Sequence, residues 1–138
     1  MTDPNPMTLP VYCVCLERET ERRATLDKRL SELNISPVFV GVDGSNLPKQ
    51  FKPRYKEHLA QQVFGRGLSK GEIGCYSSHL QIWQMMLANN EEVALILESD
   101  AEPDATSISI AQQLVKQTDD WDLLLLYWSE CQIGRAHV

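Results

Sequence analysis

The sequence lacks the signatures of several common classes of protein. No Gly-x-Gly-x-x-Gly motif follows its first apolar segment and no Walker loop is present, so neither a Rossmann dehydrogenase nor a P-loop NTPase is expected. No apolar run reaches the ~18 residues that span a bilayer, so no transmembrane segment is expected. The net charge of −6 argues against a nucleic-acid partner, because nucleic-acid binders usually present a basic face.

The chain also lacks a secretory signal and a zinc-type cysteine framework. Residues 1–9 have no basic flank and no apolar core, so they are interpreted as a disordered leader and not as a signal peptide. Cys13 and Cys15 share one face of an expected strand, but no matching Cys or His pair recurs at zinc-site spacing. Reduced core thiols are favoured for these two residues, and Cys75 is interpreted as a small core residue as well. A cytoplasmic protein is expected.

What the sequence does contain is an alternation of strand-like and helix-like segments. Short apolar runs predict buried strands, and apolar residues at helical spacing predict helices. Their order predicts an α/β fold in which a mostly parallel sheet is flanked by helices. The expected strands cover residues 10–16, 38–42, 93–97 and 123–127, and the expected helices cover residues 20–33, 55–64, 69–90 and 107–117.

The segment from Ser69 to Glu72 has the spacing of a capping box, which marks the start of the clearest helix. In such a box the Ser hydroxyl and the Glu carboxylate bind amide groups that the first helical turn leaves free. Helical spacing also predicts which residues face the core. These are Leu26, Leu30 and Leu33 on the first helix, Ile73, Tyr76, Leu80, Trp83 and Leu87 on the third, and Ile110, Leu114 and Val115 on the last.

Glu98 and Asp100 stand where the third expected strand ends. In open α/β sheets, ligands bind at the carboxyl ends of the strands. Two carboxylates there suit a hard divalent cation such as Mn²⁺ or Mg²⁺, which in turn can hold a phosphate-bearing ligand. The alternative is a solvated loop that caps the next helix, and it stays open because short acidic motifs often arise by chance.

Three further charged residues lie near expected strand ends. Asp43 follows the second strand, where an acid accepts a hydrogen bond from a ribose hydroxyl in nucleotide-binding folds, although Asp-Gly is also a strong turn dipeptide. Arg22 and Arg23 open the first helix, where they suit a phosphate contact. The pattern alone favours a solvated face for both arginines, because most charge clusters are exposed.

Glu72 and His79 lie on the face of the third helix that also carries Cys75. The capping box explains Glu72 without a role in binding or catalysis. Cys75 and His79 have the spacing of a thiol–imidazole pair. A histidine that is hydrogen-bonded within the fold is the favoured interpretation, because neighbours on one helix rarely form a working nucleophile.

Taken together, four blocks of the sequence resemble glycosyltransferase family 25, which includes bacterial lipopolysaccharide glycosyltransferases and procollagen galactosyltransferases. The third block is the most specific, since it is close to the family's Ser-x-Gly-Glu-Ile-Gly-Cys-x-x-Ser-His signature. The blocks are Val11–Leu16 with Glu21–Arg23, then Val40–Gly44, then Leu68–His79 with Trp83, and finally Leu95–Asp100.

The resemblance implies a GT-A-like (Rossmann-like) fold and a hexosyltransferase activity. The enzyme would transfer a sugar, with galactose expected, from a UDP-sugar donor to a glycan or lipopolysaccharide acceptor, and peripheral association with a membrane stays open. A divalent metal, Mn²⁺ or Mg²⁺, would bridge the diphosphate to Glu98 and Asp100. Arg22, Arg23, Asp43, Glu72 and His79 would belong to the donor site, and no catalytic base is assigned. The alternative is a non-catalytic nucleotide-sugar-binding or scaffold member of the same fold.

Ser99 departs from the family pattern, because it stands where the acidic motif has its central Asp. A hydroxyl is a weaker ligand than a carboxylate and carries no charge. If the central position binds metal in the family, this chain should bind metal less tightly. If only the outer pair binds metal, the serine should have no effect.

The resemblance also bears on how much of a domain the chain contains. Members of the family are longer, so residues 10–131 are interpreted as the N-terminal, nucleotide-sugar-binding part of a domain that is incomplete at its C-terminus. Activity of this part alone is not assured. Residues 132–138 are interpreted as a non-native tail, because they follow a strand abruptly, have no apolar period and match one reading frame of a common sequencing adapter.

Overall fold

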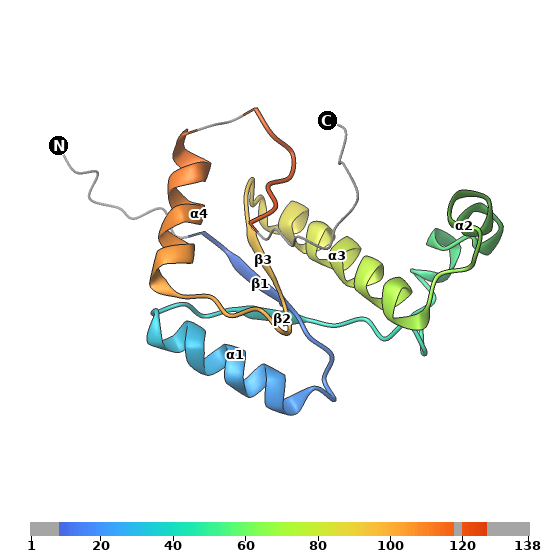
Figure 1. Cartoon of the computed structure of the whole chain (residues 1–138), viewed down its shortest axis with the longest axis horizontal. Coiled ribbons are helices and arrows are strands. Elements are labelled where there is room, and N and C mark those ends of the chain that lie inside the picture. The colour runs from blue at the N-terminus through green and yellow to red at the C-terminus, as the bar shows by residue number, and fades with distance from the viewer. Residues whose placement is uncertain (1–8, 118–119, 127–138) are drawn as a thin grey trace.

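The computed structural model describes residues 9–117 and 120–126, which form an α/β fold. Three parallel strands lie in the order β2-β1-β3, and helices cover both faces of the sheet (Figure 1). The predicted α/β class and parallel sheet are therefore confirmed. The elements are β1 (Val11–Val14), α1 (Thr20–Glu32), β2 (Val38–Val40), a 3-10 turn (Lys52–Arg54), α2 (Glu57–Phe64), α3 (Lys70–Asn89), β3 (Leu95–Glu98) and α4 (Ala105–Gln117).

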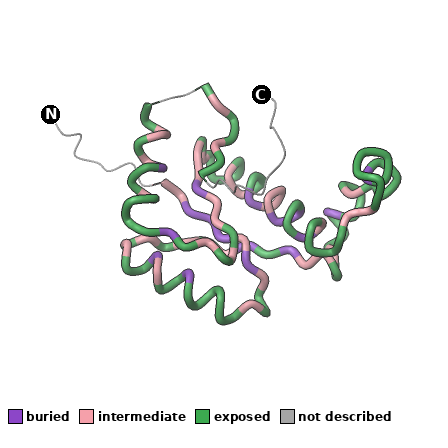
Figure 2. The backbone as a smooth tube through the Cα atoms, in the orientation of Figure 1, coloured by how far each residue is buried: buried purple, intermediate pink, exposed green. Residues whose placement is uncertain are grey.

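The central strand β1 sends alternate side chains to two separate apolar clusters, as the period of a strand requires. Cys13 is fully buried in the cluster formed with α1 and α4, and Tyr12 is buried in the cluster formed with α3. Buried positions follow the sheet and the helix sides that face it (Figure 2). Cys13 and Cys15 are both buried free thiols, which confirms the prediction of core cysteines.

The ends of α3 and α1 follow from their sequences. Ser69 accepts a hydrogen bond from the Glu72 amide at 3.1 Å, and the Glu72 carboxylate accepts one from the Ser69 amide at 2.7 Å, so the predicted capping box is present. Asn90 directly follows α3, and Asn34 lies two residues past the end of α1. Both asparagines adopt left-handed backbone conformations, with φ of 55° and 58°. Asparagine tolerates this conformation better than most residues, which makes it a common helix terminator.

The prediction of the buried face of α3 is wrong. The buried residues of this helix are Gly74, Ser77, Ser78 and Ile82, whereas Trp83 is 46% exposed. The physical reason is close approach: a Cβ atom at position 74 would lie 2.7 Å from the Val42 carbonyl oxygen, so only glycine fits. Periodicity of large apolar residues does not detect a helix that packs through small ones. Tyr76 and Leu87 are exposed too, while Ile73 and Leu80 are half-buried.

Hydrogen bonds attach α3 and the residues just beyond it to the rest of the fold. Near the middle of the helix, the buried Ser78 hydroxyl accepts a hydrogen bond from the Val42 amide at 2.9 Å and donates one to the Gly74 carbonyl at 2.8 Å. Just past its end, Glu91 accepts a hydrogen bond of 2.6 Å from the hydroxyl of Tyr12 on β1. These contacts fix α3 against the loop after β2 and against the central strand.

The C-terminal predictions are only partly met. α4 buries Ala111 and packs Ile108 against the core, while Ile110, expected to face inward, is 48% exposed and Leu114 and Val115 are half-buried. No strand forms at residues 123–126, and Leu125 is 76% exposed. An apolar run becomes a strand only where another strand supplies hydrogen-bond partners, which a sequence pattern does not report.

Some expectations lie outside the described residues. These are Tyr127 of the last expected strand, nearly all of the expected leader, and the expected tail at 132–138. Among residues 9–117 and 120–126, no helix combines the length and the apolar character needed to cross a membrane.

Candidate functional site

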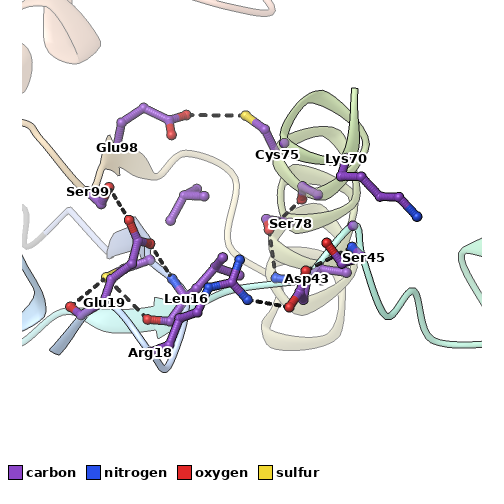
Figure 3. Close-up of a pocket in the computed structure, with 16 residues that line it drawn as sticks. Leu16, Arg18, Glu19, Asp43, Ser45, Lys70, Cys75, Ser78, Glu98 and Ser99 are labelled. Carbon is purple, nitrogen blue, oxygen red and sulfur yellow. Dashed lines mark hydrogen bonds and ion pairs between the residues drawn. The ribbon is translucent and has the colours of Figure 1, made fainter. Parts of the chain in front are cut away.

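The loops after the parallel strands meet at one edge of the sheet and surround a hollow of about 200 Å³. All three strands point the same way, so their carboxyl ends share this edge. The wall comes from the loop after β1, the loop after β2, the first half of α3 and the end of β3 (Figure 3). Segments far apart in sequence therefore contribute polar side chains to one place.

Glu98 closes one side of this hollow and contacts two side chains of α3. Its Oε1 atom lies 3.0 Å from Nε2 of His79, and the Cys75 thiol donates to the same oxygen at 3.8 Å. The hydrogen bond from His79 is the main cause that lowers the pKa of Glu98 below its ordinary value. Desolvation, followed by the nearby Glu98 charge, raises the pKa of the Cys75 thiol. One possible ligand atom from each residue lies within 4.8 Å of the others, so the group could hold a metal ion.

Cys75 was expected to be a small core residue, and this prediction is wrong. Its side chain is exposed and points from α3 towards Glu98 (Figure 3). The burial of α3 through Gly74 and Ser78 turns position 75 to the edge of the sheet. The spacing of Cys75 and His79 was a usable signal, but the partner from β3 was not visible in the sequence.

Ser99 belongs to a polar bridge between the end of β3 and the start of α1. Arg22 donates hydrogen bonds of 3.2 Å to the Ser99 hydroxyl and to Glu19, and the Ser99 hydroxyl donates to Glu19 at 3.4 Å. Glu19 also accepts a hydrogen bond of 2.8 Å from the Leu16 amide. The serine that departs from the acidic motif therefore contacts a carboxylate and a guanidinium on the α1 side.

Asp100 lines a second hollow of about 350 Å³, together with Arg22 and Arg29. The chain turns directly after β3, because the Ala101 amide donates a 3.0 Å hydrogen bond to the Glu98 carbonyl. Residues two apart would share a face in a continuing strand, but this turn separates them. Glu98 and Asp100 consequently line neighbouring hollows whose common wall is Ser99.

Asp43 lies across the first hollow from Glu98 and is part of a tight turn. It forms an ion pair with Arg18 and accepts a 2.8 Å hydrogen bond from the Ser45 amide. The Ser45 amide, and next the Arg18 guanidinium, lower the pKa of Asp43. A Cβ atom at Gly44 would lie 1.8 Å from the Lys70 carbonyl oxygen, so glycine is required there. Arg18 was missed because its charge is one of many in the segment 17–23.

Arg23 and Glu72 were expected in the donor site, but their side chains contact residues outside the two hollows. The guanidinium of Arg23 lies 4.4 Å from the centre of the Phe39 ring, a cation–π contact. Glu72 binds Arg66 through both carboxylate oxygens at 2.8 and 2.9 Å, and this pairing is the main cause that lowers its pKa to about 2. Neither residue is among the described residues that line the two hollows.

The fold and this edge define a class: α/β proteins whose parallel sheet presents charged and polar loops at the carboxyl ends of its strands. The chain belongs to glycosyltransferase family 25, because the family profile described as "Glycosyltransferase family 25 (LPS biosynthesis protein)" matches residues 8–135. The family suggested by the four sequence blocks is thereby confirmed.

Three curated relatives illustrate this membership. A "Glycosyltransferase 25 family member" of Aedes aegypti is 35% identical over 83% of this chain and 20% of its own length. An "Inactive glycosyltransferase 25 family member 3" of Homo sapiens is 30% identical over 84% and 21%, and a "Procollagen galactosyltransferase 1" of Danio rerio is 27% identical over 91% and 22%. The chain thus spans about a fifth of the length of these relatives. No solved structure shows a significant match.

Proposed function

We propose that residues 10–131 form the donor-binding part of a metal-assisted hexosyltransferase. The reaction is the transfer of a sugar, with galactose expected, from a UDP-sugar to a glycan or lipopolysaccharide acceptor in the cytoplasm. Membership of the family supports the reaction class. The family description names lipopolysaccharide biosynthesis, which supports a lipopolysaccharide acceptor. The Danio rerio relative is named a procollagen galactosyltransferase, which supports a galactosyl donor.

The observation that carries this proposal is the hollow at the carboxyl edge of the sheet. Its volume of about 200 Å³ is smaller than the ~300–1,000 Å³ typical of pockets that bury a small-molecule ligand, so it would hold only part of a nucleotide sugar. Lys70 and the start of α3 place positive charge and a helix N-terminus at its wall, which favours a diphosphate. Asp43, which lines the same hollow, would accept a hydrogen bond from the ribose.

The carboxylates of Glu98 and Asp100 fit a hard divalent cation by their chemistry. Because they line neighbouring hollows, one cation held by both would have to lie beside Ser99, the wall that the two hollows share. Such a cation, above all Mg²⁺, is commonly held by one or two carboxylates, substrate phosphates and water. His79 would orient Glu98 through the 3.0 Å contact, as outer hydrogen-bond partners of metal ligands usually do. A bound Mn²⁺ or Mg²⁺ would supply Lewis acidity that stabilises the departing diphosphate. Arg22 would contact the phosphates, while Arg23 and Glu72 would act indirectly through the positions of α1 and α3.

The test is the metal dependence of UDP-sugar binding, measured by calorimetry on the full chain with and without Mn²⁺. Tighter binding with Mn²⁺ is expected for the wild type, and Asp100→Ala should remove that gain. Asp122→Ala is the matched control, because it removes an exposed carboxylate that lines neither hollow among the described residues. If Asp100→Ala leaves the gain intact, Asp100 has no part in metal binding.

A second candidate is a non-catalytic member that binds nucleotide sugars without transferring them. Two observations favour it: a human relative carries the name of an inactive family member, and Ser99 stands at the central position of the acidic motif. Turnover separates the two candidates. Donor binding without transfer and without donor hydrolysis supports the non-catalytic member, and either reaction excludes it.

A further inference from the structure

Three side chains of different chemistry converge at the end of β3. Cys75 and His79 lie four residues apart on α3, so they project from the same face of the helix. Glu98 reaches them from the sheet, with its Oε1 atom 3.0 Å from the His79 nitrogen and 3.8 Å from the Cys75 sulfur. A thiol, an imidazole and a carboxylate therefore surround one point.

The spacing of these ligand atoms is close to that around a zinc ion. Tetrahedral Zn²⁺ bonds nitrogen and oxygen at about 2.0 Å and sulfur at about 2.3 Å, which sets its ligand atoms about 3.3–3.6 Å apart. The two distances to Glu98 differ from this range by a few tenths of an ångström, and all three ligand atoms lie within 4.8 Å of one another. Small side-chain rotations would suffice to enclose the ion.

The chemistry of the donor set selects among metals. Hard cations such as Mg²⁺ prefer oxygen ligands only, whereas zinc binds sulfur, nitrogen and oxygen together. Three protein ligands leave a fourth tetrahedral position free for water or a ligand atom. Cys75 and Glu98 are exposed, so an ion can reach the group from solvent.

We propose that Cys75, His79 and Glu98 form a zinc site, and that zinc bound there withdraws Glu98 from the donor metal. On binding, the Cys75 thiol loses its proton to solvent and the sulfur forms the bond to zinc. Glu98 is common to both sites, so the two ions compete for its carboxylate. The second half of this inference rests on the proposed function, because it requires a donor metal at Glu98 and Asp100.

The first experiment measures zinc binding by the full chain, without reference to any activity. Zn²⁺ affinity is measured by competition with a chromophoric chelator, and Co²⁺ serves as a probe whose absorption reports a bond to a thiolate. The wild type should bind one zinc ion and show the thiolate–cobalt band. Cys75→Ser should lose the band, and each of Cys75→Ser, His79→Asn and Glu98→Gln should weaken zinc binding by about 100-fold or more, since even outer-shell partners contribute about 10–100-fold.

Matched controls keep this result specific. Cys131→Ser removes another thiol of the chain, and Asp100→Asn removes the donor-metal carboxylate that the proposed zinc site does not use. Both variants should therefore bind zinc as the wild type does. Circular dichroism checks that each variant is folded, and Cys75→Ser is the decisive one because its side chain is exposed. Equal zinc affinity of the wild type and Cys75→Ser would overturn the zinc site.

The second experiment tests the competition. UDP binding in the presence of Mn²⁺ is measured with increasing Zn²⁺, and zinc should weaken it in the wild type but much less in Cys75→Ser. If zinc binds and UDP affinity stays constant, the withdrawal of Glu98 is wrong. If the wild type shows no Mn²⁺-dependent UDP binding at all, the proposed function fails, while the zinc site is still judged by the first experiment.

Discussion

On one face of the sheet, α1 packs through buried leucines, whereas on the other face α3 packs through small and polar residues ahead of Ile82. Leu26 and Leu30 are buried on the first face, and Gly74 and Ser78 are buried on the second. The first arrangement removes apolar surface from water and contributes mainly to stability. The second lets the backbone of α3 approach the loop after β2, which turns Cys75 and His79 towards Glu98. The face covered by α1 thus contributes mainly to stability, whereas the face covered by α3 determines the geometry of the site.

The largest expected effect comes from the apolar face. Leu30 is fully buried, so Leu30→Ala should lower the free energy of unfolding by about 2–5 kcal/mol, as loss of a buried leucine generally does. Urea denaturation followed by circular dichroism measures the change. Leu59→Ala on α2 is the control, because Leu59 is 48% exposed and should cost much less. Equal losses for both variants would contradict the assignment of the core to this face.

The second prediction addresses the small-residue face. Gly74→Ala would place a methyl group 2.7 Å from the Val42 carbonyl oxygen, and overpacking of this kind costs about 1–3 kcal/mol. Gly71→Ala is the control on the same helix, because its nearest neighbour would be the Ser69 hydroxyl at 3.9 Å. Gly71→Ala should be neutral or stabilising, since alanine favours a helix. If Gly74→Ala and Gly71→Ala are equally stable, α3 does not depend on a small residue at position 74 for its packing.

The third prediction concerns Ser99, which lies between the hollow lined by Glu98 and the hollow lined by Asp100. Because Ser99 contacts Glu19 and Arg22, an aspartate there would be repelled by Glu19 and attracted by Arg22. We expect Ser99→Asp to change the unfolding free energy by less than about 1 kcal/mol, as is usual for exposed charge pairs. Mn²⁺ affinity should stay constant if the new carboxylate keeps the contact with Arg22 that the Ser99 hydroxyl makes. A clear gain in affinity would show that the central position of the motif binds metal.

The smallest effect concerns the capping residue of α3 and depends on pH. Arg66 and the Ser69 amide hold the pKa of Glu72 at about 2, below its ordinary value of 4.5. A lowered pKa means that the carboxylate stabilises the fold above about pH 4.5, and that this contribution is lost as the pH falls towards 2. The stability difference between the wild type and Glu72→Gln should therefore shrink over this range. Glu32→Gln, an exposed change on α1, is the charge-matched control.

Local signals in the sequence predict the elements well. The capping box at Ser69, the parallel α/β order and the buried strand around Cys13 are read directly from residue spacing and are present in the structure. These features depend on neighbours in sequence. For the same reason, Asn34 could be recognised as the end of the first helix.

Three features of α3 and of the end of β3 depend on long-range contacts and were not predicted. The close approach of α3 uses Gly74 and Ser78, and neither residue contributes to an apolar periodicity. The turn after β3 separates Glu98 from Asp100, although a spacing of two suggests one shared face. The partner of Glu98 is a histidine 19 residues earlier in the chain, and only the packing of α3 on the sheet brings it within 3.0 Å.

Two hydrogen bonds, one near the middle of α3 and one just beyond its end, hold this helix in place. One point is the hydrogen bond between Ser78 and the Val42 amide, and the other is the bond between Tyr12 and Glu91 beyond the far end of the helix. These two attachments restrain the position of α3 relative to the loop that carries Asp43 and to the central strand. His79 is the next residue after Ser78, so the hydrogen bond that attaches α3 to the loop before Asp43 also sets the place of the imidazole that contacts Glu98 on the opposite wall of the hollow.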